Sequence, residues 1–184
     1  MKPSQRAREI EAFIALLAER DVRTYLEIGA RYGQTLEAVG NALAVPSVLV
    51  VVEQPGSLWG RDDSWPVLEA VAERLRQKGH GVWLIQGNSQ DPATAQQVRE
   101  IQDTFDAVFI DADHRYEGVK KDWELYGPMA RLVGFHDIAP LPRNHVIEVP
   151  RLWHELAKQY RTIEFCDPAE PGMGIGILFP REMR

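Results

Sequence analysis

The hydrophobic pattern of the chain alternates between short apolar runs and longer segments in which apolar residues recur every three or four positions. Short apolar runs bounded by turn residues are typical of strands, and the longer period is typical of amphipathic helices. The predicted strands are RTYLEIG (23–29), SVLVVVE (47–53), GVWLIQG (81–87), DAVFIDA (106–112) and RLVGFHDI (131–138). The predicted helices that follow them lie near residues 34–44, 64–78, 91–102, 116–129 and 150–160.

Alternating strands and helices predict right-handed crossovers and a mostly parallel sheet with helices on both faces. The end of the chain differs, because the strand-like runs YRTIEFCD (160–167) and GMGIGILF (172–179) are joined by only a few residues, which favours an antiparallel pair. We therefore expect an α/β fold: a Rossmann-like, doubly wound, mostly parallel seven-stranded sheet with a C-terminal antiparallel strand pair. No repeat or linker interrupts the pattern, so residues 1–184 are expected to form a single domain.

The N-terminal segment, residues 1–20, predicts one more helix. Ile10, Phe13, Ile14 and Leu17 recur at helical spacing, so residues 4–20 form an amphipathic pattern with one apolar face. Packing of that face against the domain is the expected role. A lid over a bound acceptor is the alternative.

Composition and charge narrow the class of protein. A formal net charge of −6 over 184 residues argues against a general nucleic-acid-binding surface. The apolar stretch VPSVLVVV is too short to span a bilayer, and the charged N-terminus lacks the apolar core of a signal peptide. The single cysteine, Cys166, is expected to be a packed thiol in a late strand and fits a reducing compartment. We expect a cytoplasmic protein without nucleic-acid or membrane partners.

The loop after the first predicted strand, YLEIGARYGQT, carries the first candidate chemistry. Gly29 and Gly33 fit a tight turn in which the backbone approaches a ligand, but neither GxxxxGK[ST] nor GxGxxG is present. Glu53 ends the second strand, where a carboxylate can accept both hydroxyl groups of a ribose. Glu27 ends the first strand, where it would repel a phosphate but attract an ammonium group. A nucleoside with an amino group and no phosphate fits both, and S-adenosylmethionine (SAM) is such a molecule.

Several motifs in order along the chain resemble a known family. They are ExGxxxG at 27–33, Glu53, GNSQDP at 87–92, FIDADHRYEGVKKDW at 109–123, FHDI at 135–138 and MGIGIL at 173–178. This order resembles the class I SAM-dependent methyltransferases. The nearest group is the small metal-associated O-methyltransferases, including macrolide and aminocoumarin sugar O-methyltransferases and the cephalosporin-hydroxylase-like proteins.

The resemblance implies a set of cofactor contacts. Gly29 through Gly33 would lie against the methionine part, Glu53 with Gln54 would hold the ribose, and Asn88 with Ser89 would lie beside adenine. Relatives often have an aspartate where Asn88 stands, so an amide carbonyl would replace a carboxylate there. The implied cofactor-binding residues are Glu27, Gly29, Ala30, Arg31, Tyr32, Gly33, Glu53, Gln54, Asn88, Ser89 and Asp111.

A second cluster of polar residues follows the fourth and fifth predicted strands. Asp111 ends one strand, and His136 with Asp137 ends its neighbour, so these three side chains could bind one hard cation such as Mg²⁺. A metal-free cleft, with His136 as an ordinary strand-end histidine, is the alternative. Side chains alternate along a strand, so His136 and Asp137 can share an ion only if the strand has already ended.

Two residues compete for the role of catalytic base. In sugar O-methyltransferases the second aspartate of a DxD pattern is the base, which selects Asp113. In catechol-type relatives a lysine three residues after the metal-binding aspartate is the base, and His114 occupies that offset. The ordinary pKa of histidine, near 6.5, suits proton removal at neutral pH, so His114 is favoured. Asp113 could instead cap the following helix.

The function that these features predict is SAM-dependent O-methylation of a small hydroxylated molecule. A catalytically silent SAM-binding or structural module in a larger assembly is the alternative, and the missing GxGxxG disfavours a nicotinamide dehydrogenase. Acceptor recognition is left to the N-terminal helix, the 54–65 loop with Trp59 and Trp65, the 139–149 loop or another subunit of a homo-oligomer. Trp65, at a predicted helix start, is expected to pack against the core.

Overall fold

The computed structural model describes residues 7–58, 62–140, 146–167 and 172–183. Seven strands form one sheet in the order β3-β2-β1-β4-β5-β7-β6. The strands are β1 (Thr24–Ile28), β2 (Val48–Glu53), β3 (Gly81–Gln86), β4 (Phe105–Ile110), β5 (Ala130–Ala139), β6 (Tyr160–Phe165) and β7 (Met173–Met183). The pairs among β1 to β5 are parallel, whereas β7 runs antiparallel to both β5 and β6. The predicted Rossmann-like, doubly wound sheet with an antiparallel C-terminal pair is therefore confirmed.

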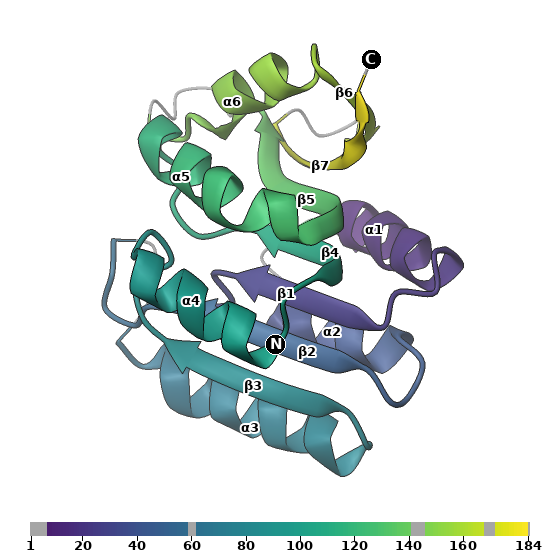
Figure 1. The fold of residues 1–184 in the computed structure, drawn as a ribbon, viewed down its shortest axis with the longest axis vertical. Coiled ribbons are helices and arrows are strands. Elements are labelled where there is room, and N and C mark those ends of the chain that lie inside the picture. The colour runs from purple at the N-terminus through teal and green to yellow at the C-terminus, as the bar shows by residue number, and fades with distance from the viewer. Residues whose placement is uncertain (1–6, 59–61, 141–145, 168–171, 184) are drawn as a thin grey trace.

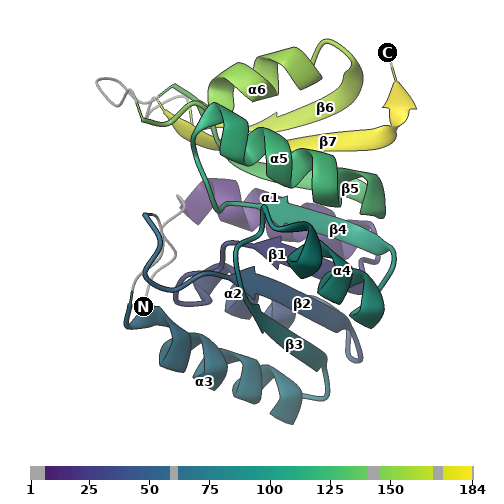
Figure 2. The ribbon, with the colours of Figure 1, turned by 60° about the vertical axis from the view of Figure 1, so that its left-hand side comes forward.

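The helices cover both faces of the sheet and make three layers (Figures 1 and 2). They are α1 (Ala7–Glu19), α2 (Gln34–Ala42), α3 (Ser64–Gln77), α4 (Pro92–Ile101), α5 (Tyr116–Tyr126) and α6 (Val149–Leu156), with a short 3-10 helix at Gly127–Met129. Helices α1 to α3 pack on one face and α4 to α6 on the other, each over its own hydrophobic core. The central strands β1 and β4 are buried on both faces, which explains why they were continuous apolar runs in the sequence.

Helix α1 packs against the domain, as its apolar face predicted. Ile10, Phe13 and Leu17 are buried, and the ring of Phe13 stacks on Phe109 of β4 with centroids 5.0 Å apart. Since the helix also contacts α2, β6 and β7, its described part is a piece of the core rather than a cover over the ligand edge.

Strand β5 contains the one irregularity that matters for the site. Its pairing with β7 shifts register between His136 and Ala139, and Asp137 lies there with a φ of 58°. A positive φ at a non-glycine residue within a strand marks a bulge, which redirects the side chain. The strand thus continues to Ala139 but turns Asp137 out of the regular alternation.

Some local predictions change with the structure. Cys166 lies just beyond β6 and is exposed, so the expected packed thiol is wrong: Phe165 packs against the core, and Cys166 follows the exposed Glu164 on the outward side of the alternation. Trp65 packs partly buried against the core, as expected, and Trp59 lies outside the described residues.

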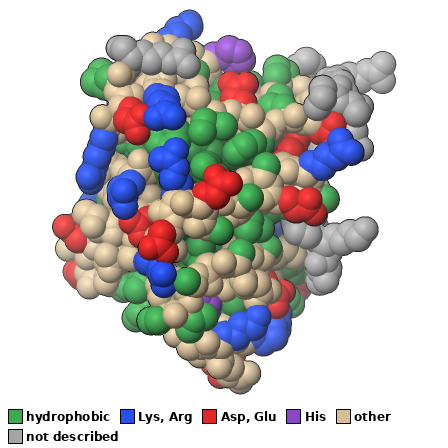
Figure 3. Space-filling view, turned by 90° about the vertical axis from the view of Figure 1, so that its right-hand side faces the viewer, with side chains coloured by type: hydrophobic (Ala, Val, Ile, Leu, Met, Phe, Trp, Pro, Cys, Tyr) green, Lys and Arg blue, Asp and Glu red, His purple; other side chains and the backbone are tan. Residues whose placement is uncertain are grey.

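The face of the molecule shown in Figure 3 carries side chains of both charges. On this face Lys and Arg side chains are interspersed with Asp and Glu around a central group of hydrophobic side chains. Separately, no helix within the described part of the chain is long and apolar enough to cross a membrane.

Candidate active site

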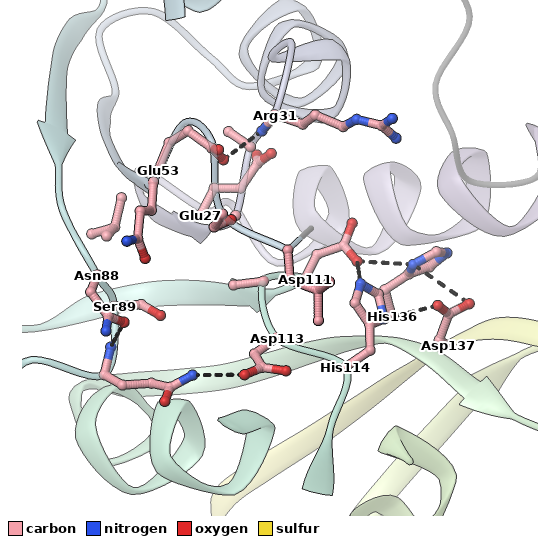
Figure 4. A pocket seen from close by; sticks show the side chains of 18 of the residues that line it. Glu27, Arg31, Glu53, Asn88, Ser89, Asp111, Asp113, His114, His136 and Asp137 are labelled. Atoms are coloured by element: carbon pink, nitrogen blue, oxygen red, sulfur yellow. Dashed lines mark hydrogen bonds and ion pairs between the residues drawn. The ribbon is translucent and has the colours of Figure 1, made fainter. Parts of the chain in front are cut away.

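A pocket of about 360 Å³ opens at the carboxyl ends of the parallel strands. The segments that follow β1, β2, β3, β4 and β5 all contribute to its lining, and Figure 4 shows how their side chains converge. Strand order reverses between β1 and β4, and ligands of doubly wound sheets bind at that position. The predicted residues that line the pocket are Glu27, Gly29, Ala30, Arg31, Glu53, Gln54, Asn88, Ser89, Asp111, Asp113, His114, His136 and Asp137.

Two of the predicted cofactor residues, Tyr32 and Gly33, do not line the pocket. The Tyr32 hydroxyl donates to Asp63, 2.8 Å away, and so ties the first loop to the segment before α3. Gly33, with a φ of 78°, is the N-cap of α2, and a Cβ there would come 2.9 Å from the side chain of Leu68. Its glycine therefore serves the turn and the packing of α3 rather than a direct ligand contact.

Gly29 forms the tight turn that the sequence predicted, and it also allows a close approach of two loops. Its φ of 85° lies in the left-handed region, and a Cβ would come 2.5 Å from the carbonyl oxygen of Asp111. The loops after β1 and β4 can approach each other this closely only because Gly29 has no side chain. The same turn leads into α2, whose N-terminal amides receive no side-chain cap. Amides at a helix N-terminus favour a negatively charged ligand group.

Glu27 is a buried carboxyl group at the base of the pocket. Its side chain accepts a hydrogen bond of 2.9 Å from the Tyr25 hydroxyl and is only 1% exposed. Burial and, to a smaller extent, the nearby charges of Asp111 and Glu53 together raise the pKa of Glu27 to about 8, against the lowering effect of the Tyr25 hydrogen bond. An ammonium group that arrived here would offset these charges and stabilise the carboxylate.

Glu53 faces the first loop from the end of β2. Its Oε2 accepts the backbone N–H of Arg31 at 2.7 Å, as Figure 4 shows. Burial raises the pKa of Glu53 above its usual value, although the amides of Arg31 and Ala30 lower it. The hydrogen bond fixes the carboxylate within the pocket, where its other lone pairs can accept hydroxyl groups.

The loop after β3 is held from beneath. The Tyr126 hydroxyl donates to the carbonyl oxygen of Ser89 at 2.8 Å, and the Asn88 side-chain oxygen accepts the backbone N–H of Gln90 at 3.0 Å. Asp122, completely buried on α5, lies beneath Ser89. Burial raises the pKa of Asp122 to about 7, and the Ser89 hydroxyl lowers it. This loop is therefore a preorganised wall of the pocket.

Asp113 has partners that occupy its carboxylate. The Arg115 guanidinium donates to it at 2.9 Å through Nε, and Gln90 Nε2 donates at 3.1 Å. The Arg115 backbone N–H also donates, at 3.0 Å, so Asp113 shapes the start of α5. These donors occupy both oxygens of the Asp113 carboxylate and hold it against Arg115 and Gln90.

Four side chains gather at the other end of the pocket, between the ends of β4 and β5 (Figure 4). His114 Nδ1 lies 3.0 Å from Asp137 Oδ2, and His136 Nδ1 lies 2.9 Å from Asp111 Oδ1. His114 Nε2 is 3.7 Å from Asp111 Oδ1. The structure thus brings together all three predicted metal ligands and the favoured base.

The bulge in β5 explains how two successive residues reach this cluster. We expected His136 and Asp137 to converge only if the strand had ended. The strand continues, but the bulge turns the Asp137 side chain toward the same side as His136. Burial lowers the pKa of His136, but the charges of Asp111 and Asp137 outweigh it and raise that pKa to about 9. His136 is therefore a cation at neutral pH in this arrangement.

The same cluster contains side chains of the types that bind metal ions. Within the described ranges, no three His, Cys, Asp or Glu side chains are arranged to hold a metal ion. The two carboxylates of Asp111 and Asp137 meet at adjacent strand ends and suit a divalent cation, whereas His136 could bind one only as a neutral imidazole.

Sequence reasoning missed several residues that line the pocket, among them Gln34, Thr35, Gln90, Ile147 and Met173. Gln90 lies within the GNSQDP motif and Gln34 directly follows the first motif, so their positions could have indicated them. Ile147 and Met173 carry no chemical signal, and only the packing of α6 and β7 beside β5 brings them to the pocket.

The comparisons with known proteins agree with this geometry. Residues 26–138 match a family model described as a methyltransferase domain. The fold is similar to an O-methyltransferase from Bacillus cereus solved in complex with S-adenosylhomocysteine, with a TM-score of 0.71, 15% identity and coverage of 96% of this chain and 84% of that chain. It is also similar to TomG, an O-methyltransferase from Streptomyces achromogenes involved in tomaymycin synthesis and solved with SAM, with a TM-score of 0.65, 16% identity and coverage of 96% and 81%. No curated protein sequence matches the chain.

Proposed function

Because this chain belongs to the methyltransferase-domain family, we propose that it transfers the methyl group of SAM to a hydroxyl oxygen of a small acceptor. One observation carries the proposal. Glu27 and Glu53 stand at the cofactor end of a single pocket, and His114 with Asp137 stands at its other end. Glu27 and Glu53 suit the ammonium and ribose groups of SAM. His114 with Asp137 suits removal of a proton from the acceptor.

The cofactor end matches the charge of SAM, whose ammonium and sulfonium groups are both cationic. Glu27 and Asp111 lie beside the path that the methionine part would follow, and the arriving ammonium group would favour the ionised form of Glu27. The carboxylate of that part fits the uncapped amides at the start of α2, where Thr35 also lines the pocket. The ribose hydroxyls fit Glu53, and the purine then extends toward the loop after β3.

Methyl transfer at the other end is a single displacement. The acceptor oxygen attacks the methyl carbon, the carbon–sulfur bond breaks, and its electron pair stays on sulfur as a neutral thioether. The hydroxyl proton passes to His114 Nε2, since Nδ1 of that ring faces Asp137. Asp137 then stabilises the imidazolium, and positioning of oxygen, methyl carbon and sulfur in line supplies the rest of the rate enhancement.

A divalent cation such as Mg²⁺ fits the carboxylate oxygens of Asp111 and Asp137, and His136 would join them only as a neutral imidazole, after its proton has been displaced. When bound, the cation would lower the pKa of the acceptor hydroxyl and fix the position of its oxygen. The residues themselves orient the acceptor: Ile147 and Met173 line the same region and suit a molecule with an apolar body beside its hydroxyl group.

The test has two parts. Calorimetry should show that S-adenosylhomocysteine binds in preference to NAD, and a panel of small phenols and sugars should release S-adenosylhomocysteine from SAM. His114→Ala should lower turnover by roughly 10²–10⁴-fold with little change in cofactor affinity. Asp113→Ala is the matched comparison. If it alone lost turnover, Asp113 would be the base, and if neither did, the base assignment would be wrong.

Failure of S-adenosylhomocysteine to bind would overturn the whole proposal. Tight binding of S-adenosylhomocysteine without transfer to any acceptor would favour a catalytically silent SAM-binding module instead.

A further inference from the structure

We propose that a second pocket, at the opposite edge of the sheet from the active site, binds a phosphate group. This pocket has a volume of about 140 Å³ and lies where β4 and β5 begin and β7 ends. Its charged side chains are those of Arg20, Arg131, Arg181, Asp106 and Glu182. The site takes no part in the proposed methyl transfer, so the two proposals can fail separately.

The first observation is the distribution of charge around the pocket. Three arginines line it, and a fourth, Arg161, lies over the ring of Phe179, which forms part of its wall. Among the described residues, two carboxylates line the same pocket, although the formal net charge of the whole protein is −6. A local excess of positive charge that opposes the net charge of the chain favours an anionic ligand.

The carboxylate of Asp106 is held mainly by the start of β1. Its Oδ2 accepts the backbone N–H groups of Arg23 and Thr24 at 2.9 and 3.1 Å, and it also accepts the Thr24 hydroxyl at 3.1 Å. Its Oδ1 lies 3.3 Å from Arg131 Nη1, a long contact to an exposed guanidinium. Asp106 is therefore satisfied largely without the arginines of the pocket.

Two guanidinium groups of the pocket are left for a ligand. Glu182 is already paired, because it accepts from Arg161 at 2.7 Å. Within the described part of the chain, neither Arg20 nor Arg181 forms an ion pair with a carboxylate. Arg20 instead lies over the buried ring of Phe179, 5.3 Å from its centroid. That contact steadies the planar guanidinium while its N–H groups stay available to an anion.

A bulge in β7 places the second of these arginines at the pocket. Two successive residues of β6, Tyr160 and Arg161, pair with Met183 and Phe179 of β7. The three residues of β7 between these pairs have no partners on β6, and Arg181 is at their centre. A bulge takes a side chain out of the regular alternation, and here the redirected side chain lines the pocket.

Phosphate fits this arrangement better than a carboxylate does. Its oxygens point in several directions, so they can accept from guanidinium groups that follow α1 or lie on β5 and β7. The fork of N–H groups on each arginine also matches two phosphate oxygens. The small volume suits the phosphate group alone, and the body of a phosphate ester would lie outside, on the face that Figure 3 shows. Free phosphate and a phosphate ester share this chemistry.

Calorimetry and thermal unfolding with inorganic phosphate and with phenyl phosphate test the site, against sodium chloride at the same ionic strength. Inorganic phosphate should bind saturably at millimolar concentration and raise the melting temperature, because it binds the folded protein and bridges three of its elements. Chloride should do neither. Phenyl phosphate that binds at least as tightly indicates an ester as the ligand, and weaker binding indicates the free ion; both results support the site.

Arg20→Gln and Arg181→Gln should each weaken phosphate binding by roughly 3- to 10-fold, the range for losing one charged partner at an exposed site. Without phosphate, Arg181→Gln should unfold at the wild-type temperature, so it separates binding from folding. Arg31→Gln is the matched control, because it makes the same change in the active-site pocket at the other edge of the sheet, and it should keep the wild-type affinity for phosphate.

Three results would overturn the inference. The first is no saturable binding of phosphate by wild-type protein, or equal stabilisation by chloride. The second is wild-type affinity in both folded variants, Arg20→Gln and Arg181→Gln. The third is loss of binding in Arg31→Gln alone, which would place the phosphate in the active-site pocket instead.

Discussion

Replacing Glu27 with glutamine should stabilise the protein and weaken its binding of S-adenosylhomocysteine. Glu27 is 1% exposed, and the charges of Asp111 and Glu53 add to the effect of burial, so its pKa is raised from 4.5 to about 8. The neutral glutamine has nearly the same shape and can still accept the hydrogen bond from Tyr25. It avoids the cost of a buried charge but cannot pair with an ammonium group.

The size of the stability change follows from the two pKa values. Below pH 4.5 Glu27 is protonated in both the folded and the unfolded protein, so its contribution is constant. Between pH 4.5 and about 8 the unfolded protein releases a proton that the folded protein retains, so the free energy of unfolding falls as pH rises. At 1.36 kcal/mol for each pKa unit, this cost reaches about 3 kcal/mol at pH 7. Relief of that cost should raise the melting temperature of Glu27→Gln by roughly 6–12 °C at pH 7.

Urea unfolding of wild type and Glu27→Gln at pH 5, 6, 7 and 8 measures the difference in their free energies of unfolding at each pH. The stabilisation should be small at pH 5 and should grow steadily to pH 8. Affinity of wild-type protein for S-adenosylhomocysteine should rise over the same range, because the ammonium group binds the ionised carboxylate, and the variant should bind roughly 10- to 100-fold more weakly at pH 8. A stabilisation that is absent, or equal at pH 5 and pH 8, would refute the reasoning.

Three further changes test other parts of the site. Glu53→Ala should weaken S-adenosylhomocysteine binding by roughly 1–3 kcal/mol in calorimetry, and an unchanged affinity would remove Glu53 from the cofactor site. Asp111→Asn and Asp137→Asn should stay folded and lose any stimulation of methyl transfer by Mg²⁺, whereas full wild-type activity in EDTA would contradict the metal proposal. Glu148 accepts the Tyr116 backbone N–H at 3.0 Å and donates its own amide to the His114 carbonyl at 2.7 Å. Glu148→Ala should therefore cost about 1 kcal/mol of stability in urea unfolding, and no loss would show that water replaces this cap.

The sheet and the cofactor end were predictable because they depend on local patterns. The apolar runs that became β1 and β4 are buried on both faces, so their composition alone indicated central strands. Glu53 is the last residue of β2, as expected, and Glu27 is the penultimate residue of β1, which ends at Ile28. Parallel strands bring such residues to one edge without any further information.

The acceptor end was less predictable because its geometry depends on a departure from regular structure. Alternation along β5 would send His136 and Asp137 to opposite faces, and no sequence pattern indicated the bulge that redirects Asp137. The roles of Asp113 and His114 were also left open, because both follow β4 at suitable offsets. What distinguishes them is contact with distant residues: Asp113 meets Gln90 from another loop, and His114 meets Asp137 from another strand.

The position of β7 in the sheet has a consequence for the newly made protein. Strand β7 follows β6 in the chain but lies between β5 and β6, so β5 has an open edge until Met173–Met183 has left the ribosome. The bulged stretch of β5 pairs with β7 on both sides, through His136 with Ile175 and Ala139 with Met173. Chains are synthesised from the N-terminus at roughly 5–20 residues per second, so β5 lacks its neighbouring strand until β7 emerges. In that interval the unpaired edge of β5 is open to pairing with another chain.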